Sequence, residues 1–430
     1  MAQHGTEAET LVETICRSMF LKDFTVRSPP YKRESGLQKE AADVLVPFGD
    51  VLIAFQVKSK KGPGSGKATE DTYRQRVEKT VSEGIDQLKT IKRAVKARQI
   101  ATLQNAASVE LPFNPDAFRK IVGVVVLDLP DQRNLAREEQ LRIFNGYEKR
   151  HEIPAHIFRS DELQALAGEI DTLPDFLAYL ELREKLYSEG KIFPLTSELD
   201  LLALYKMRPE QLMEVAQNPD THLLLDDNLW DDYRRTYSAE IARRKADNEP
   251  AYLIDHAIEA IHSAIGFPDP GKVALPPSIS LPANSLETYG ALALELARIP
   301  RLERRLIGTT WLEKMLKAQS SGLAYALVKL SQDTKEALLI MASSESDRQR
   351  RAHLLFSYAA AAYCHLNATK VLALVTEPLS SPSRSYDFLM LSGVGFHNEA
   401  ELRQLATQLF APQRSVSQTE FRPDGKKQDK

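Results

Sequence analysis

The chain has 430 residues, which suggests two or three domains at about 150 residues each. Its 43% apolar and 27% charged residues are ordinary for a globular protein and exclude a disordered, collagen-like or disulfide-rich scaffold. The formal net charge of −3 excludes a molecule that is basic overall, so binding to nucleic acid would have to rest on a local patch.

The cysteines and the hydropathy of the chain narrow the class of protein further. The two cysteines form no Cys-x-x-Cys pair, so a structural zinc site is not expected. The polar N-terminus lacks the basic and apolar regions of a signal peptide, and no apolar run approaches the ~20 residues of a membrane span. We therefore expect a cytoplasmic protein that does not enter a membrane.

The first 190 residues alternate helical and strand-like patterns. Apolar residues at helical spacing predict a helix over 8–21, and 70–97 is expected to form a long, strongly charged helix. Two further helices are expected, one capped by Ser160 and one from about Leu173 to Leu186. Short apolar runs predict four strands, over 43–48, 51–58, 121–129 and 155–158.

The pattern after Gly190 is mostly helical, with a long helix predicted over 308–332. This change indicates an α/β domain followed by a mainly α-helical one. The polar stretch at the end is expected to be disordered. The predicted parts are residues 1–190, 191–411 and 412–430.

The two strands around Gly49-Asp50 determine which residues lie opposite each other. A two-residue hairpin loop places Asp43 opposite Gln56, with Cβ atoms ~5 Å apart. Lys58 lies two residues further along and shares the face of Gln56. The second strand is otherwise apolar on both faces, which is typical of a central strand covered by helices. A carboxylate, an amide and an ammonium group at its end are costly unless they bind one another or a ligand.

The helix over 8–21 offers a further carboxylate. Glu9 lies on the flank of its apolar stripe, and Glu13 lies about 40° further round. If this helix packs on the sheet face that bears Asp43, Glu9 is the better placed of the two, with Glu13 as the reserve. The simpler alternative is that Glu9 only completes a capping box with Thr6.

Glu9 in an N-terminal helix, then Asp43, then Gln56-Val57-Lys58, resembles the PD-(D/E)XK nuclease superfamily. The likeness is greatest to Mrr-like restriction endonucleases, in which Gln occupies the acidic position. Gln87 in the charged helix resembles the Gln-bearing helix of RecB-like members. The resemblance covers residues 1–190 and implies a restriction-endonuclease-like α/β fold, a mixed sheet flanked by helices. Ala42 replaces the Pro that often precedes the Asp, and Gln56 removes one negative charge from the metal site.

The resemblance implies a metal-dependent endonuclease that hydrolyses phosphodiester bonds of DNA, in restriction or phage defence. Asp43, the Gln56 side-chain oxygen and the Val57 carbonyl are hard ligands suited to Mg²⁺, for which Mn²⁺ can substitute. Glu9 would bind the ion through water or hold a second one. Lys58 would orient or deprotonate the attacking water and stabilise charge in the transition state.

The resemblance predicts the substrate class and the binding partners less precisely than it predicts the metal site. RNA stays open as a substrate because the metal chemistry is the same. Cleavage of two strands by two paired sites would require a homodimer. The helical C-terminal domain is the expected place for target recognition or a partner protein.

Residues 57–98 form the basic stretch, with twelve Lys and Arg side chains but only five Asp and Glu, a net charge of +7. Such a stretch directly after the catalytic strand would face a phosphate backbone. The alternative is a solvated helix of mixed charge. The candidate nucleic-acid contacts are Lys60, Lys61, Arg74, Arg76 and Gln87.

Each candidate also has a plain structural interpretation. Asp43 and Lys58 could form a simple ion pair, Gln56 could be a core amide, and Gln87 a helix-surface residue. From another functional class, the domain could be a catalytically silent nuclease fold that binds nucleic acid or a protein. The presence of all three hairpin residues favours the enzyme. Outside this domain, a small basic cluster is formed by Arg301, Arg304 and Arg305. We expect it to lie on an ordinary solvent-exposed surface and not to contact nucleic acid.

Overall fold

The computed structural model describes residues 2–21, 24–27, 29–32, 38–59, 70–104, 110–128, 145–193, 197–225, 228–265, 286–330, 335–382 and 384–410. These residues fold into two compact units, one up to Ala242 and one from Arg243 onward. The change of pattern at Gly190 therefore does not separate the units, because the helices directly after it belong to the first unit. The predicted tail over 412–430 lies outside the described residues.

The first unit is built on a six-stranded mixed sheet with the strand order β1-β4-β5-β8-β10-β9. β4 is antiparallel to β1 and to β5, β8 is parallel to β5 and to β10, and β9 is antiparallel to β10. The strands are β1 (Val26–Arg27), β4 (Val44–Phe48), β5 (Val51–Ser59), β8 (Lys120–Asp128), β9 (Tyr147–Arg150) and β10 (Ile153–Arg159). The predicted α/β architecture with β5 at its centre is confirmed.

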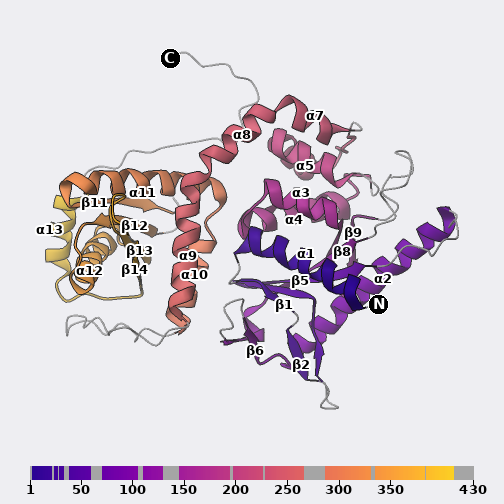
Figure 1. Cartoon of the computed structure of the whole chain (residues 1–430), viewed down its shortest axis with the longest axis horizontal. Coiled ribbons are helices and arrows are strands. Elements are labelled where there is room, and N and C mark those ends of the chain that lie inside the picture. Colours follow the sequence, from indigo (N-terminus) through magenta and orange to yellow (C-terminus); the bar gives the residue numbers. More distant parts are fainter. Residues whose placement is uncertain are drawn as a thin grey trace. The chain divides into compact units, whose positions relative to one another are not determined.

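Four helices cover the two faces of this sheet (Figure 1). They are α1 (Ala2–Phe20), α2 (Glu70–Lys96), α3 (Ser160–Glu169) and α4 (Leu173–Ser188). Leu52 and Ala54 of β5 pack in one core with Leu88 of α2. On the opposite face the ring of Phe20 in α1 lies 6.2 Å from that of Phe55. α3 and α4 share that face with α1, so α2 alone of these four covers the other.

The β4–β5 hairpin has the predicted register. Phe48 pairs with Val51 and Val44 with Phe55, as a two-residue loop requires. Gly49 in the loop has φ 59°, a left-handed conformation that glycine adopts without steric cost.

Smaller elements complete the first unit. Two short antiparallel ribbons, β2 with β3 and β6 with β7, lie outside the main sheet. A buried ion pair of Arg183 with Glu198 ties α4 to α5. The bounds are β2 (Pro30–Lys32), β3 (Gln38–Glu40), β6 (Thr102–Gln104), β7 (Glu110–Pro112), η1 (Pro115–Ala117), α5 (Glu198–Met207), α6 (Pro209–Gln217), α7 (Leu229–Thr236) and α8 (Ser238–Asp247), the last of which crosses the boundary between the units.

The second unit contains helices, as predicted, and also a four-stranded sheet that the sequence analysis missed. The strand order is β11-β12-β13-β14, with β12 and β13 parallel and both edge strands antiparallel. The strands are β11 (Leu323–Lys329), β12 (Glu336–Ser343), β13 (Lys370–Thr376) and β14 (Tyr386–Ser392). The helix predicted over 308–332 is therefore wrong in its last turns, because α11 ends at Ser321 and Gly322 follows with φ 74°.

Helices lie on both faces of the second sheet. α12 packs on Leu339 and Ala373, and on the other face the indole Nε1 of Trp311 in α11 donates to the Met341 carbonyl at 2.9 Å. The helical elements are η3 (Glu249–Ala251), α9 (Tyr252–Ile265), α10 (Leu286–Ala297), α11 (Arg301–Ser321), α12 (Arg348–Leu366) and α13 (Glu399–Leu409). Within the described ranges, none of the helices combines the length and apolar character needed to cross a membrane.

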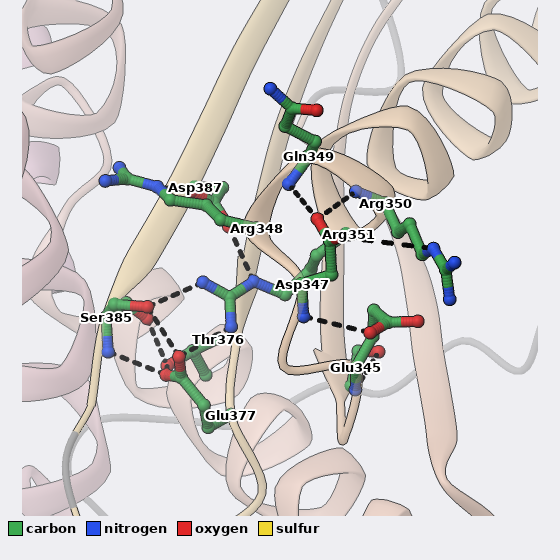
Figure 2. Close-up of polar contacts among 11 residues, drawn as sticks. Glu345, Asp347, Arg348, Gln349, Arg350, Arg351, Thr376, Glu377, Ser385 and Asp387 are labelled. Atoms are coloured by element: carbon green, nitrogen blue, oxygen red, sulfur yellow. Dashed lines mark hydrogen bonds and ion pairs between the residues drawn. The ribbon is translucent and has the colours of Figure 1, made fainter. Parts of the chain in front are cut away.

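Figure 2 shows how a buried arginine joins α12 to the ends of β13 and β14. The guanidinium of Arg351 donates to Asp387, Glu377 and Ser385, each at 2.6 Å. Its side chain is only 3% exposed, and a buried charge is costly unless it is paired. The two carboxylates, Glu377 and Asp387, balance the charge of Arg351. Each guanidinium nitrogen of Arg351 has an acceptor within the cluster, so we interpret the cluster as a structural link between α12, β13 and β14.

The basic cluster at the start of α11 is buried as well. Arg301, Arg304 and Arg305 are 6%, 2% and 6% exposed, so the exposed surface expected from the sequence is wrong. The physical reason is pairing with carboxylates, because Asp255 of α9 binds Arg301 and Arg304, and Asp247 lies 4.0 Å from Arg305.

Candidate active site

The backbone of the hairpin holds the Asp43 carboxylate at one end of β5. Asp43 directly precedes β4, and its N–H donates to the Phe55 carbonyl at 3.2 Å. In return, the Val57 N–H donates to Asp43 Oδ2 at 2.6 Å. These two bonds place the carboxylate beside the Gln56-Val57-Lys58 segment, as the predicted pairing requires.

Gln56 and Lys58 lie on the sheet face covered by α2. Gln56 is 4% exposed. The Lys58 ammonium donates a hydrogen bond to Gln87 Oε1, although Gln87 is 29 positions further along the chain. α2 comes close to the sheet here because Gly84 has no side chain, and a Cβ at Gly84 would lie 2.6 Å from a methyl of Val125. Gln87 is exposed on the surface of α2 and also bonds Lys58, whose charge acts on Asp43 as well.

Burial and like charge raise the pKa of two carboxyl groups near this end of β5. Burial is the main cause for Asp43, opposed by the Val57 N–H and the Lys58 charge and reinforced by Glu40. The pKa of Glu9 is raised by burial and then by the charge of Asp43, against the lowering effect of Arg27. Burial and nearby negative charge thus disfavour the ionised form of both groups, and a bound cation would offset this.

Glu40 is a carboxylate that the sequence analysis did not select. Its charge raises the pKa of both Glu9 and Asp43, so it lies within electrostatic reach of both. It ends β3 and precedes Asp43 by three residues. The sequence offers only this three-residue spacing as a sign that Glu40 lies near Asp43. The spacing alone does not predict that the two carboxylates are close, because that depends on how the chain folds.

The structure distinguishes Glu9 from Glu13. Glu13 is 7% exposed and forms ion pairs with Arg17 and, at 3.1 Å, with Arg27. Glu9 is more exposed and lies 3.8 Å from Arg27. α1 begins at Ala2, so Thr6 lies inside the helix, and the capping-box interpretation of Glu9 is wrong.

One geometric expectation for α1 is also wrong. The helix packs on the face of Phe55, opposite to the face of Gln56 and Lys58. Side chains alternate along a strand, so a helix that contacts Phe55 cannot cover Gln56 as well. Glu9 therefore approaches Asp43 from the other side of the sheet.

The predicted nucleic-acid contacts are only partly described. Lys60 and Lys61 lie outside the described residues. Arg74 is exposed and Arg76 half-buried near the start of α2, and the thirteen residue steps from Arg74 to Gln87 span roughly 20 Å of helix. Other bases of this stretch are paired, for example Lys92 with Glu152 at 2.6 Å. The basic stretch is therefore not a uniformly free surface.

The donors at this end of β5 are oxygens, which fit Mg²⁺ or Mn²⁺ rather than zinc. Asp43 directly precedes β4 and Gln56 lies in the adjacent β5, and a cation would offset the effect of the Asp43 charge on Glu9. In the part of the chain that the structure describes, no three His, Cys, Asp or Glu side chains form a metal-holding group. The predicted ligand set, with an amide and a carbonyl, contains only two such side chains.

Comparisons of the chain with models of protein families, with curated proteins and with solved structures gave no match.

Proposed function

We propose that this chain is a metal-dependent nuclease that hydrolyses phosphodiester bonds of DNA at the end of β5. The observation that carries the proposal is the hydrogen bond from Lys58 to Gln87, beside an Asp43 carboxylate that is held by the Val57 N–H. A lysine, a carboxylate and an amide are thereby held by backbone and side-chain bonds at one strand end. The order helix, hairpin, helix and parallel strand supports the restriction-endonuclease-like fold that the sequence suggested.

Each residue has a defined part in this proposal. Asp43 and Gln56 would hold the ion together with the Val57 carbonyl, and Glu9 would reach it directly or through water. A bound Mg²⁺ would polarise the phosphoryl group and lower the pKa of a bound water. Lys58, as an ammonium group fixed by Gln87, is suited to orient the attacking water and to stabilise negative charge on the phosphoryl oxygens.

The test is cleavage of plasmid and linear DNA with Mg²⁺ or Mn²⁺ by the wild type and by Lys58→Ala, prepared identically. Lys185→Ala is the matched control, because Lys185 is exposed on α4 and outside the site. We expect the wild type and K185A to cut and K58A to lose most of its rate, since residues of one catalytic unit act together. A labelled RNA of the same sequence separates the two substrate classes.

Two other results would count against the proposal. Equal cutting by wild type and K58A would point to a contaminating nuclease or to a different site. DNA binding without cutting, unchanged in Asp43→Ala with or without metal, would favour the catalytically silent binding module.

A further inference from the structure

The strand β11 forms one edge of the second sheet, and among the described strands it pairs with β12 alone. The hydrogen bonds just outside its two ends show which residues turn toward β12. The Leu330 N–H donates to the Glu336 carbonyl at 3.1 Å, and the Ser344 N–H donates to the Gly322 carbonyl at 2.8 Å. Bonding directions alternate along an antiparallel strand, so the even-numbered residues bond to β12 and the odd-numbered ones direct their N–H and C=O groups outward.

The outward backbone groups of β11 belong to Leu323, Tyr325, Leu327 and Lys329. Within the part of the chain that the structure describes, the Ser321 hydroxyl donates to the Leu323 carbonyl at 2.9 Å, and the backbone groups of the other three residues have no partner. β11 is half-buried from Tyr325 to Val328, whereas β12 is buried from Ala337 to Ser343. This edge therefore offers unpaired donors and acceptors to another strand.

The other edges of the two main sheets carry features that discourage such pairing. β1 has two residues, and β9 has four, of which three are charged. β14 carries Asp387, which is paired with Arg348 and Arg351, and the strand contacts α9 and α10. β11 has seven residues, no proline and a single charge at its last position. A long apolar edge strand without such protection is suited to pair with another chain.

The side chains of β11 match a second copy of the same strand. An antiparallel partner centred on Ala326 overlaps all seven residues, and it places Tyr325 opposite Leu327 and Leu323 opposite Lys329. Registers centred on Tyr325 or Leu327 would leave two residues of each strand without a partner. Ala326 then faces its own copy in a non-hydrogen-bonded pair, where two strands approach most closely and a small side chain fits. The two Lys329 side chains lie at opposite ends, about 20 Å apart along the strands, so no charge faces a like charge.

We propose that two copies of this chain pair through β11, antiparallel about a twofold axis at Ala326, so that two four-stranded sheets form one continuous sheet. A twofold contact uses the same surface on both copies and closes at two chains, whereas pairing of β11 with β14 of another copy would extend into a filament. The dimer would carry two copies of the candidate site, but the inference does not rest on the proposed nuclease function.

The first test is sedimentation equilibrium of the full chain over a wide range of concentrations. Leu327→Pro removes an outward N–H near the centre of the edge and leaves the hydrogen bonds to β12 in place. Leu327→Ala is the matched control, because it also loses the leucine side chain but keeps the N–H. We expect the wild type and L327A to form dimers, and the dimer dissociation constant of L327P to exceed that of L327A by about tenfold or more. Circular dichroism checks that each variant is folded.

A cysteine cross-link tests the register and does not depend on the folding of L327P. In Ala326→Cys the two thiols would face each other across the twofold axis, at a separation that suits a disulfide. Val328→Cys is the control, because Val328 is half-buried on the same face and would lie about 14 Å along the strands from its own copy. On a non-reducing gel we expect oxidised A326C to be a covalent dimer and V328C to be a monomer.

Two results would overturn the proposal. One is a wild type that stays monomeric at every concentration, which would assign the edge to a segment of the same chain or to another protein. The other is a dimer that L327P does not weaken relative to L327A and that A326C does not cross-link, because the two copies would then meet through a different surface.

Discussion

Glu9 and Glu13 lie one turn apart on α1, yet their surroundings give them different roles. Glu13 is buried between Arg17 and Arg27, and these two positive charges balance it. The pKa of Glu9 is raised by burial and then by the charge of Asp43, while Arg27 lowers it. Glu13 thus has two close cationic partners, whereas Glu9 has the longer 3.8 Å pair with Arg27 and a like charge nearby, which fits the proposed role of Glu9 as a ligand.

We therefore expect Glu9→Gln and Glu13→Gln to separate metal binding from stability. E9Q should weaken Mn²⁺ binding by about tenfold or more, because it removes a carboxylate from the proposed site. E13Q should leave the Mn²⁺ affinity near that of the wild type and lower the free energy of unfolding. Calorimetric Mn²⁺ titration and urea unfolding measure the two quantities, and the reverse assignment would make Glu13 the ligand.

A buried arginine also determines the protonation state of His156. Arg183 Nη1 lies 3.0 Å from His156 Nδ1, and arginine can only donate. Nδ1 must therefore accept, so the ring is neutral and carries its proton on Nε2. Burial, followed by the charges of Arg183 and Lys120, lowers the pKa of His156 well below its ordinary value.

The lowered pKa predicts a pH dependence of stability. An unfolded His156 binds a proton below about pH 6.5 and the folded one does not, so the free energy of unfolding should fall as the pH drops below that value. Above it the contribution is fully present. The slope of urea-derived free energy against pH should be less steep in His156→Gln, by up to about 1.4 kcal/mol per pH unit. Equal slopes would show that His156 does not titrate differently in the two states.

At the scale of elements, the contact between α11 and η3 rests on one missing side chain. A Cβ added to Gly308 would lie 1.9 Å from the Pro250 carbonyl oxygen, which is a backbone atom and cannot rotate away. Gly308 therefore allows α11 to lie directly against η3. Asp255 in α9, the helix that follows η3, then reaches Arg301 and Arg304.

We expect Gly308→Ala to lower the free energy of unfolding by about 1–3 kcal/mol, the usual cost of forcing atoms into a packed interface. Gly290→Ala is the matched control, because Gly290 lies within α10 and a Cβ there meets nothing within 4 Å. That variant should be neutral or more stable by up to about 1 kcal/mol, since alanine favours the helix. Chemical denaturation of both variants measures the difference, and equal effects would contradict the close contact.

At the scale of the whole molecule, the net charge is small, but positive and negative residues are unevenly distributed along the chain. The net charge is −3, while residues 57–98 carry a net +7 from twelve bases and five acids. Some of these bases are paired within the fold, such as Arg98 with Asp116 at 2.6 Å. Attraction to a polyanion would therefore be local and sensitive to salt.

DNA binding should weaken steeply with salt concentration despite the negative net charge. A double variant, Lys60→Ala with Lys61→Ala, should reduce the slope of log K against log salt by about 1.8, if both lysines contact phosphates of duplex DNA. Fluorescence anisotropy at several salt concentrations measures this slope. If the affinity of the wild type for DNA did not change with salt concentration, the basic stretch would not be a DNA-binding surface.

The sequence alone determined most of the first sheet and the pairing within the candidate site. Alternation of apolar residues and the Gly49-Asp50 loop predicted the hairpin register, which the structure confirms. Apolar residues on both faces predicted that β5 is a central strand. These are local properties of spacing and turn geometry, and they do not depend on how distant segments meet.

Tertiary structure alone decided the contacts between distant segments. It places Gln87 on Lys58, puts α1 on the opposite face from Gln56, and buries the basic cluster of α11. It also forms a sheet from β11 to β14, whose Leu- and Ala-rich strands have no clear twofold pattern because helices cover both faces. Pairing of strands and burial of charges depend on long-range contacts, and residue spacing along the chain does not record which segments make them.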